Sequence, residues 1–329
     1  MGKATVFEIS YDQPDGVYNS GSKVSGYVRL AFDVPTRVRA ISIRFKGKAK
    51  AKWTQPVGEL NRNTNVVVRE PYFDQTFMLM GVAPPLVQID QELPRGLHNF
   101  RFNYQLPLGL PSSFKVYDGK VEYLAVCYLM WPGSLNKKLK VPFTIIGFLD
   151  LNRIMSMGQE GAEEQTVCCC CCKTGPIKAR FHIEKNTFVP GEAIKLFAEI
   201  NNGSGRITET CVSLNMLYTF KLNEMEHRSV REIAKVTRPG IAPYETDVWS
   251  GEELVIPPTP PSFLPGCNLI DIEYFLELNI SSANLGSYPP IRLKIIIGTV
   301  RTVTTTQPVA LQVARLVMQM ATNRLWPFN

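Results

Sequence analysis

Residues 41–53 read ISIRFKGKAKAKW, and alternate positions of this stretch differ completely in chemistry. One set of alternate positions is apolar or small: Ile41, Ile43, Phe45, Gly47, Ala49, Ala51 and Trp53. The other set starts at Ser42 and continues with five cations: Arg44, Lys46, Lys48, Lys50 and Lys52. Because successive side chains of a β-strand point to opposite faces, this pattern predicts one strand with a buried face and a charged, wet face.

The same period of two recurs along the chain. Alternating apolar and polar residues occupy 24–32, 99–106, 177–184, 272–280 and 291–297. One buried and one wet face per strand is typical of antiparallel sheets packed against each other as sandwiches. The sequence therefore predicts an all-β fold.

The length of 329 residues and an apolar fraction of 45% are sufficient for two domains with separate cores. The longest weakly hydrophobic interval in the middle of the chain is 156–166, which contains two glycines and three glutamates. We place the domain boundary there. The expected organisation is a first sandwich over 1–155, a linker and Cys-rich strand over 156–175, a second sandwich over 176–300 and a short tail over 301–329. The tail pattern is compatible with either a helix or a strand.

The two halves also resemble each other in their turns. A glycine turn leads into an alternating strand at 18–24 and again at 188–194. Later in each half, at 110–114 and 260–263, a corner of proline, serine and an aromatic residue precedes another strand. Two matches in the same order favour a duplicated sandwich, although such turns are common in any β-protein.

A search for catalytic and cofactor motifs finds no phosphate-binding glycine loop and no nucleophile elbow. His98, His182 and His227 lie far apart, without the spacing of a metal site, so we expect neither a metal nor a cofactor. Cys127 lies on the apolar side of its strand pattern and is interpreted as core; a Cys-His couple is the alternative. An enzyme remains the weakest hypothesis.

Five of the eight cysteines are consecutive: Cys168, Cys169, Cys170, Cys171 and Cys172. Such a run lacks the spacing of zinc ligands or of a secreted disulfide framework. It is either a strand of small apolar residues opening the second domain or a target for palmitoylation. The first residues have no signal-peptide pattern, so we expect a cytoplasmic protein whose sequons at Asn202 and Asn279 are unused.

The cations of residues 41–53 are the main candidates for a binding site. As one strand they line about 26 Å of a single face, where they repel one another and favour a polyanion. The alternative is a solvated or edge strand that uses lysines for solubility. Lys137, Lys138 and Lys140 form a second basic cluster. The interleaved aromatics of single-strand nucleic-acid binders are missing, so phosphorylated peptides or anionic lipids fit better, and we expect no nucleic-acid partner.

Ordered blocks along residues 5–300 resemble the arrestin domain-containing proteins (alpha-arrestins). In the first half they read GVYNSGSKVSGYVRLAF (16–32), ISIRFKGKAKAKW (41–53), FRFNYQLPLGLPSSF (100–114), KVEYLAVCYLMWP (120–132) and FLDLN (148–152). In the second half they read CCCCCKTGPI (168–177), FVPGEAIKLFAEINN (188–202), LVIPPTPPSF (254–263) and YPPIRLKIIIGTV (288–300).

The resemblance implies two Ig-like antiparallel β-sandwich domains in tandem and a non-enzymatic adaptor. Such adaptors link the cytoplasmic segments of transmembrane cargo to ubiquitination, endocytosis and endosomal sorting, with peripheral association at the plasma membrane or endosomes. The Pro-Pro-x-Tyr motifs by which family members recruit ubiquitin ligases are missing from this sequence. We therefore expect any link to the ligase machinery to be indirect. The alternative function is a retromer-like coat or scaffold subunit without phosphate or ligase recognition.

Overall fold

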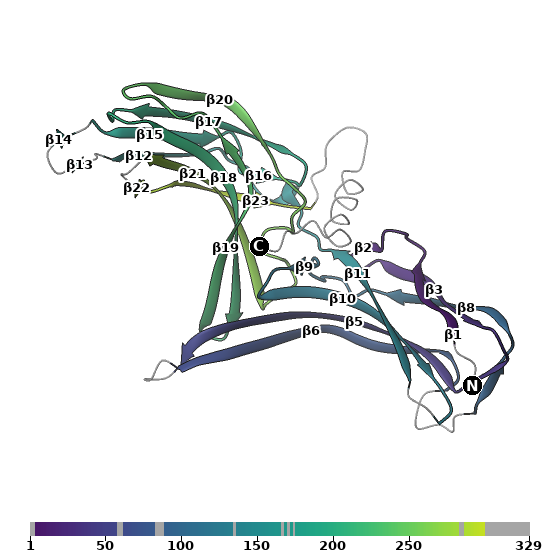
Figure 1. The fold of residues 1–329 in the computed structure, drawn as a ribbon. Helices are drawn as coiled ribbons and strands as arrows, with labels where there is room; N and C mark the ends of the chain where they lie inside the picture. Colours follow the sequence, from purple (N-terminus) through teal and green to yellow (C-terminus); the bar gives the residue numbers. More distant parts are fainter. Residues whose placement is uncertain are drawn as a thin grey trace. The chain divides into compact units, whose positions relative to one another are not determined.

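The computed structural model describes residues 4–57, 62–82, 89–133, 136–165, 168–169, 172–173, 175–282 and 286–299. The described chain forms two compact units, one comprising 4–148 and 265–270 and the other 149–264 and 271–299. Strands make up nearly all the regular structure of both units (Figure 1). The 3₁₀ turn η1 (Leu151–Arg153) is the sole helical element among the described residues. The predicted all-β fold is thus confirmed. The predicted tail, 301–329, lies outside the described residues.

The first unit packs two antiparallel sheets. The smaller sheet has the order β1-β3-β8, with β1 (Ala4–Tyr11), β3 (Lys23–Phe32) and β8 (Gly96–Gln105). The larger sheet has the order β2-β11-β10-β5-β6, with β2 (Val17–Asn19), β11 (Lys137–Ile146), β10 (Gly119–Met130), β5 (Ala40–Val57) and β6 (Arg62–Met80). The short β9 (Phe114–Lys115) pairs with β10, and β4 (Thr36–Val38) pairs with β7 (Gln91–Leu93).

Aromatic side chains from both sheets fill the core of the first unit. Phe45 on β5 is fully buried and stacks on Tyr104 of β8, with ring centroids 4.7 Å apart. Phe102 of β8 and Phe143 of β11 lie against the same Phe45 ring. Stacked and edge-on aromatic pairs of this kind contribute beyond their buried area. The apolar half of the alternating pattern therefore holds the two sheets together.

The second unit has the same plan. Its smaller sheet has the order β12-β15-β17-β20, with β12 (Gln159–Gln165), β15 (Ile177–Ile183), β17 (Ala193–Asn202) and β20 (Thr246–Val255). Its larger sheet has the order β16-β23-β21-β18-β19, with β16 (Thr187–Phe188), β23 (Ile291–Ile297), β21 (Ile270–Ser282), β18 (Thr208–Leu222) and β19 (Met225–Thr237). The short β22 (Gly286–Ser287) pairs with β21.

The interval expected to be a linker instead contains strand β12. All seven residues of β12 pair with β15 in an antiparallel ladder. Because β12 is the outermost strand of its sheet, its backbone bonds to one neighbour only and its glutamates remain hydrated. The low hydrophobicity that suggested a linker is therefore the composition of an edge strand.

The two larger sheets confirm the duplicated plan in detail. Each contains one parallel pair, β2 with β11 and β16 with β23. At the proline–serine corner of the first unit, Tyr123 donates its hydroxyl to the carbonyl of Pro111 at 2.7 Å. In the second unit Tyr274 donates to Pro260 at 2.9 Å. The predicted corners are therefore the same structural device, used once per domain.

The cysteine run was predicted to form one continuous strand, and this prediction is wrong. Cys168–Cys169 form β13, which pairs antiparallel with β14 (Cys172–Lys173), so the chain folds back on itself within the run. These two short strands pair only with each other among the described strands. Cys170 and Cys171 lie outside the described residues. The acylation hypothesis stays a prediction.

A short segment from late in the sequence, residues 265–270, belongs to the first unit. The Glu70 carboxylate on β6 accepts hydrogen bonds from the backbone N–H groups of Asn268 and Leu269, at 3.0 and 2.9 Å. Gly266 has a φ of +89°, and a Cβ there would lie 2.0 Å from the carbonyl oxygen of Gly109. Only glycine allows the backbone to approach this closely. The carboxylate of Glu70 is therefore engaged by residues 268–269, on the side of β6 opposite to the side that carries Arg69.

Asn202, the first predicted sequon, is a structural residue. Its side chain is fully buried, and its amide donates to the carbonyls of Arg206, Ile241 and Ala242. Its Oδ1 accepts from the backbone N–H and hydroxyl of Ser204. Because all its hydrogen-bonding capacity is used inside the fold, this amide is inaccessible for glycosylation.

Candidate functional site: the basic face of the first unit

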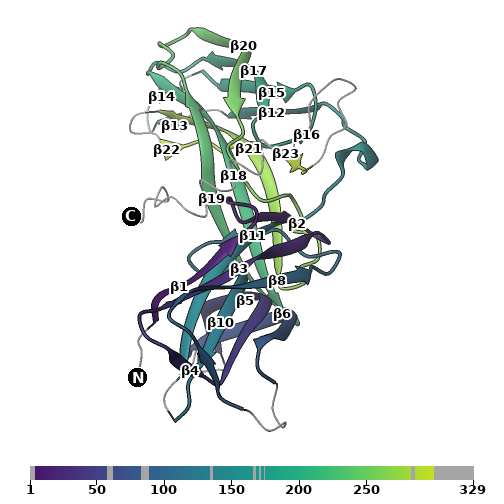
Figure 2. The same cartoon turned by 90° about the vertical axis from the view of Figure 1, so that its right-hand side faces the viewer.

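Strand β5 is a central strand of its sheet, flanked by β10 and β6 in both views (Figures 1 and 2). The alternation predicted from the sequence is confirmed, since Ile43, Phe45 and Ala49 are fully buried while the intervening cations reach solvent. The alternative of an edge strand guarded by lysines is wrong, because both edges of β5 are hydrogen-bonded. The outer face of this sheet, which carries the cations of β5, is called the basic face below.

Two of the five cations share one carboxylate. Arg44 donates from Nη2 to Oδ2 of Asp74 on β6 at 2.6 Å, and Lys46 Nζ lies 3.2 Å from the same oxygen. The hydrogen bond from Arg44 holds the pKa of Asp74 below its ordinary value, and Lys46 adds to the effect. Because the single negative charge of Asp74 is shared by Arg44 and Lys46, it neutralises half of their combined positive charge.

The next lysine along β5 is paired in the same way. Lys48 Nζ lies 3.3 Å from Oε1 of Glu122 on β10, and Lys120 Nζ lies 2.6 Å from Oε2 of the same carboxylate. Burial alone would raise the pKa of Glu122, but the hydrogen bond from Lys120, helped by Lys48, lowers it overall. The lengthwise row of cations predicted from the sequence is thus divided by two shared acids.

Lys50 has a different environment, because its direct neighbours on both sides are cations. It pairs in register with Lys120 of β10 and with Arg69 of β6. Lys120 in turn pairs with Lys115 of β9. Directly opposed residues of antiparallel strands point to the same face, so these four cations form one line across four strands. We call Lys115, Lys120, Lys50 and Arg69 the transverse row.

The remaining predicted cations lie beside this row or apart from it. Lys52 lies over the ring of Tyr117, 5.0 Å from its centroid. Lys138 and Lys140 pair with β10 residues that oppose Ser42 and Arg44, which places these two lysines on the basic face. Lys137, at the start of β11, is exposed and has the opposite parity. Lys138 and Lys140 therefore share a sheet face with the cations of β5 but do not form one site with them, and Lys137 does not lie on that face.

Sequence reasoning missed Arg69, Lys115 and Lys120. Each lies on a different strand from Lys50 and is surrounded in sequence by ordinary residues. No local pattern marks them, because only the register of β9, β10, β5 and β6 aligns them. A signal would have required knowing which strands are neighbours and in what register.

The predicted core cysteine and surface histidine are confirmed. Cys127 is fully buried, and burial raises the pKa of its thiol to about 12, so the thiolate is scarce at neutral pH. His182 is exposed and stacks on Phe197 with ring centroids 4.9 Å apart.

Among the described residues, no group of three or more His, Cys, Asp or Glu side chains is arranged to hold a metal ion. Nor does that part of the chain contain a helix long and apolar enough to cross a membrane.

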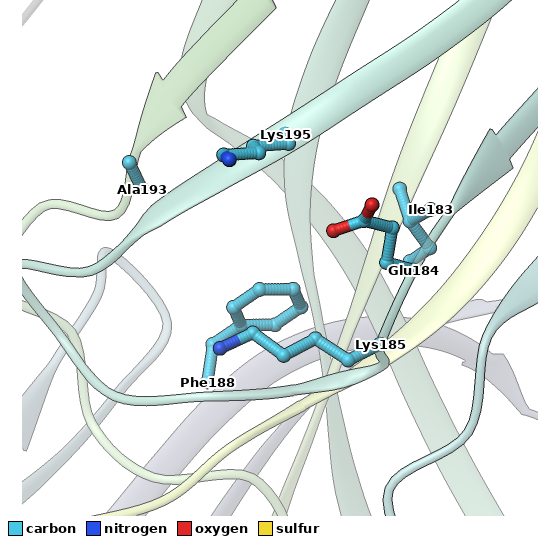
Figure 3. Close-up of a pocket in the computed structure, with 6 residues that line it drawn as sticks. All are labelled: Ile183, Glu184, Lys185, Phe188, Ala193 and Lys195. Atoms are coloured by element: carbon cyan, nitrogen blue, oxygen red, sulfur yellow. The ribbon is translucent and has the colours of Figure 1, made fainter. Parts of the chain in front are cut away.

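One open hollow of about 320 Å³ lies in the second unit (Figure 3). Its lining includes Glu184, Lys185, Phe188 and Lys195. The close-up shows Lys185 beside the Phe188 ring. Its Nζ lies 5.1 Å from the ring centroid, and it forms an ion pair with Glu192. Because Lys185 is already engaged, the described lining of the hollow offers no assembled set of reactive groups.

The structure thus defines a class: two tandem antiparallel β-sandwiches whose candidate site is a charged sheet face. Comparison with known proteins narrows this class. Residues 7–152 match the arrestin (or S-antigen) N-terminal domain, and residues 173–302 match the arrestin (or S-antigen) C-terminal domain. The chain belongs to the arrestin domain-containing proteins.

Individual relatives support the same family assignment. Human arrestin domain-containing protein 1 is 30% identical over 286 residues, which is 86% of this chain and 62% of that relative. Human arrestin domain-containing protein 4 is 30% identical over 302 residues, covering 90% of this chain and 70% of the relative. Arrestin domain-containing protein 17 of Caenorhabditis elegans is 27% identical over 289 residues, covering 83% and 67%. The chain thus spans about three fifths to two thirds of the length of these relatives.

Proposed function

We propose that this chain is a non-enzymatic, arrestin-like adaptor in membrane-protein trafficking. It holds cytoplasmic segments of transmembrane cargo during endocytosis and endosomal sorting, and it works in the cytoplasm with peripheral association at the plasma membrane or endosomes. A link to ubiquitin ligases enters the proposal only indirectly, through a second adaptor. Membership of the arrestin domain-containing family supports an adaptor role in general.

The observation that carries the proposal is the basic face of the first unit. Five cations of β5 lie on the outer face of a central strand, backed by a fully packed core. A central strand is rigid and cannot pair with another strand, so its outer face offers side chains and not backbone for binding. Excess positive charge on a rigid face attracts and orients acidic segments.

The proposal is tested by proximity labelling with the full chain fused to a biotin ligase. We expect transmembrane proteins and endosomal components to be enriched over the free ligase. A matched variant in which Lys46, Lys48 and Lys50 are together changed to Glu should lose the transmembrane proteins. The control variant Lys178→Glu, Lys195→Glu, Lys235→Glu makes the same change in charge on strands of the second unit and should keep them.

Two outcomes would contradict the adaptor function. A partner list without transmembrane proteins and dominated by coat subunits would favour the retromer-like scaffold. A list indistinguishable from that of the free ligase would remove the trafficking role altogether.

A further inference from the structure

The cysteine run is a sequence motif to which the adaptor function gives no role. Its described residues form β13 and β14, which pair with each other and with no other described strand. Both sheets of the second unit form without them, because β12 and β15, on either side of the run in sequence, pair directly. The run therefore does not supply a strand of small apolar residues that opens the second sandwich, and its cysteines need another explanation.

The β13–β14 pair lies at one end of the second unit, and Figure 1 shows it beyond the ends of β12 and β15. Gln165 at the end of β12 pairs with Ile177 at the start of β15, and Ile177 pairs with Asn202 at the end of β17. The connection that contains the run therefore leaves and re-enters the sheet beside the turn that follows Asn202.

Two glycines fix the return of this connection to the sandwich. A Cβ on Gly175 would lie 2.5 Å from the carbonyl oxygen of Gly203, and a Cβ on Gly203 would lie 2.4 Å from the carbonyl oxygen of Pro176. Only glycine at both positions allows the two backbones to approach this closely. The turn on which they meet is held by the buried Asn202. The β13–β14 pair, although it belongs to neither sheet, is therefore attached to a fixed base.

The surface around this base exposes large apolar side chains. Ile207 is 60% exposed on the turn after Asn202, and Tyr244 is 74% exposed on a second turn. The amide of Asn202 donates to carbonyls of both turns and so ties them together. Large apolar side chains displayed together on a fixed base mark a surface that contacts a partner or a membrane.

Charge does not explain what this end of the unit contacts. Glu209 and Glu245 are exposed on or beside the same two turns, against Arg206. Lys178 of the nearby β15 forms an ion pair with Glu164. Because cations are not in excess here, anionic lipids are not attracted by charge, and affinity for a membrane has to come from apolar groups.

We propose that Cys168, Cys169 and Cys172 are acylated with long-chain fatty acids, and that the acyl chains anchor this end of the second unit to a membrane. In each transfer the cysteine sulfur attacks the thioester carbonyl of a long-chain acyl-coenzyme A. The new S–C bond forms as the C–S bond to coenzyme A breaks, and coenzyme A leaves as a thiol with the cysteine proton. This inference goes beyond the adaptor function, since a cysteine is acylated whether or not the chain holds cargo.

The number of cysteines decides the strength of the anchor. One acyl chain gives reversible membrane binding, with a constant on the order of 10⁴ M⁻¹, whereas two chains hold a protein stably. Cys169 directly opposes Cys172 across the β13–β14 pair. Cα atoms at such positions are about 4.5–5.5 Å apart, so two acyl chains on this pair enter a bilayer side by side.

The first experiment counts acyl groups on the full chain, purified from a eukaryotic host. Free thiols are blocked, thioesters are cleaved with neutral hydroxylamine, and each released thiol receives a polyethylene glycol tag that slows the protein on a gel. We expect two or more tags on the wild-type chain. Changing all five cysteines of the run to Ser should lower the tagged fraction at least about tenfold, because it removes the reacting thiols. The controls Cys211→Ser and Cys267→Ser, outside the run, should keep the tags.

The second experiment measures membrane attachment by flotation with vesicles. The acylated chain should float with phosphatidylcholine vesicles and be released by hydroxylamine. Added phosphatidylserine should change the bound fraction less than about twofold, because acyl chains and not charges hold the chain. A variant that keeps Cys169 as the single cysteine of the run should carry one tag and dissociate on washing.

The apolar side chains beside the run provide a finer check. Ile207→Ser combined with Tyr244→Ser should lower the bound fraction about twofold or more while the number of tags stays the same, because less apolar surface enters the bilayer. The control Val230→Ser removes a side chain of similar exposure, 58%, from β19 and should leave the bound fraction unchanged.

Several outcomes would overturn the inference. A wild-type chain without tags, or equal tagging of the wild type and the five-fold Ser variant, would remove the acylation. Tags without flotation would remove the anchor, and flotation that requires phosphatidylserine and persists in the Ser variant would make the attachment electrostatic. Circular dichroism and urea unfolding of the Ser variant should match the wild type, since the run belongs to neither sheet. If that variant does not fold, a five-fold Ala variant replaces it.

Failure of the anchor is distinguishable from failure of the adaptor function. If the five-fold Ser variant keeps the transmembrane partners of the wild-type chain in proximity labelling, the adaptor function stands without the anchor. If the wild-type chain carries tags but labels no transmembrane partners, the acylation stands and the trafficking role falls.

Discussion

Strands β5 and β18 occupy the same place in the larger sheets of the two units, yet their outer faces differ in chemistry. Each is the second strand from one edge, lying between a long hairpin partner and the strand that carries the corner tyrosine. The inward residues of both are buried from Ile41 to Trp53 on β5 and from Val212 to Phe220 on β18, and these residues are apolar or glycine. Outward, β5 presents five cations, whereas β18 presents one, Lys221, which forms an ion pair with Asp271 at 2.8 Å.

The remaining outward positions of β18 carry no cation, and two of them bond to each other. Asn215 donates to the hydroxyl of Ser213 at 2.9 Å, and both side chains are buried. The comparison shows that folding constrains only the inward half of a strand pattern, because that half fills the core. The outward half is free to differ, and in this protein the difference separates a strand face with five cations from one with a single, paired cation.

The largest loss of stability is expected from changes to the inward, buried residues, which β5 and β18 have in common. Phe45 on β5 and Phe220 on β18 are both fully buried. Phe45→Ala and Phe220→Ala should each lower the free energy of unfolding by about 3–5 kcal/mol, since each leaves a large cavity. Urea unfolding followed by circular dichroism measures both losses.

If either variant does not fold, Phe→Leu at the same position gives a smaller loss of the same sign. A loss below about 1 kcal/mol at one position, with the full loss at the other, would show that the two strands are not equivalent in the core.

A smaller and equal effect is expected at the two corners. Tyr123→Phe and Tyr274→Phe each remove one hydroxyl that donates to a proline carbonyl. Each should lower the free energy of unfolding by about 0.5–1.5 kcal/mol, since the partner carbonyl loses its donor. Markedly unequal losses in differential scanning calorimetry would argue against one device used twice.

The smallest changes in the free energy of unfolding are expected from the outward residues. There, substitutions on β5 and on β18 should change that free energy in opposite directions. Lys50→Gln should raise the free energy of unfolding by about 0.2–1 kcal/mol, because it relieves repulsion from Lys120 and Arg69. Lys221→Gln should lower it by about 0.2–1 kcal/mol, because it breaks the pair with Asp271.

Salt and pH give independent checks on the outer-face prediction. Both changes should shrink when urea unfolding is repeated in 1 M salt, because these charges are exposed to solvent. The hydrogen bond with Asp271 raises the pKa of Lys221, so its contribution is present at neutral pH and is lost as the pH rises through that raised pKa. Changes of the same sign for both variants would contradict the contrast between the faces.

Period-two alternation was sufficient to predict the main strands and their buried positions, and the repeated proline–serine–aromatic motif was sufficient to predict the duplicated corners. Phe45 and Cys127 are core residues because a strand with one wet face must bury the other. The same logic failed at 156–175, where composition alone could not distinguish an edge strand from a linker. It also failed within the cysteine run, since uniform residues give no signal of where a chain turns.

The sequence by itself determined that β5 has a cationic face, because the direction of each side chain follows from local backbone geometry. Only the tertiary structure decided which of those cations are free. Asp74 and Glu122, on the neighbouring strands, neutralise part of the charge of β5. Arg69, Lys115 and Lys120 lie in register with Lys50 and increase the positive charge around it. Neighbouring strands are placed by hydrogen-bond register over long sequence separations, and no local pattern of residues encodes that register.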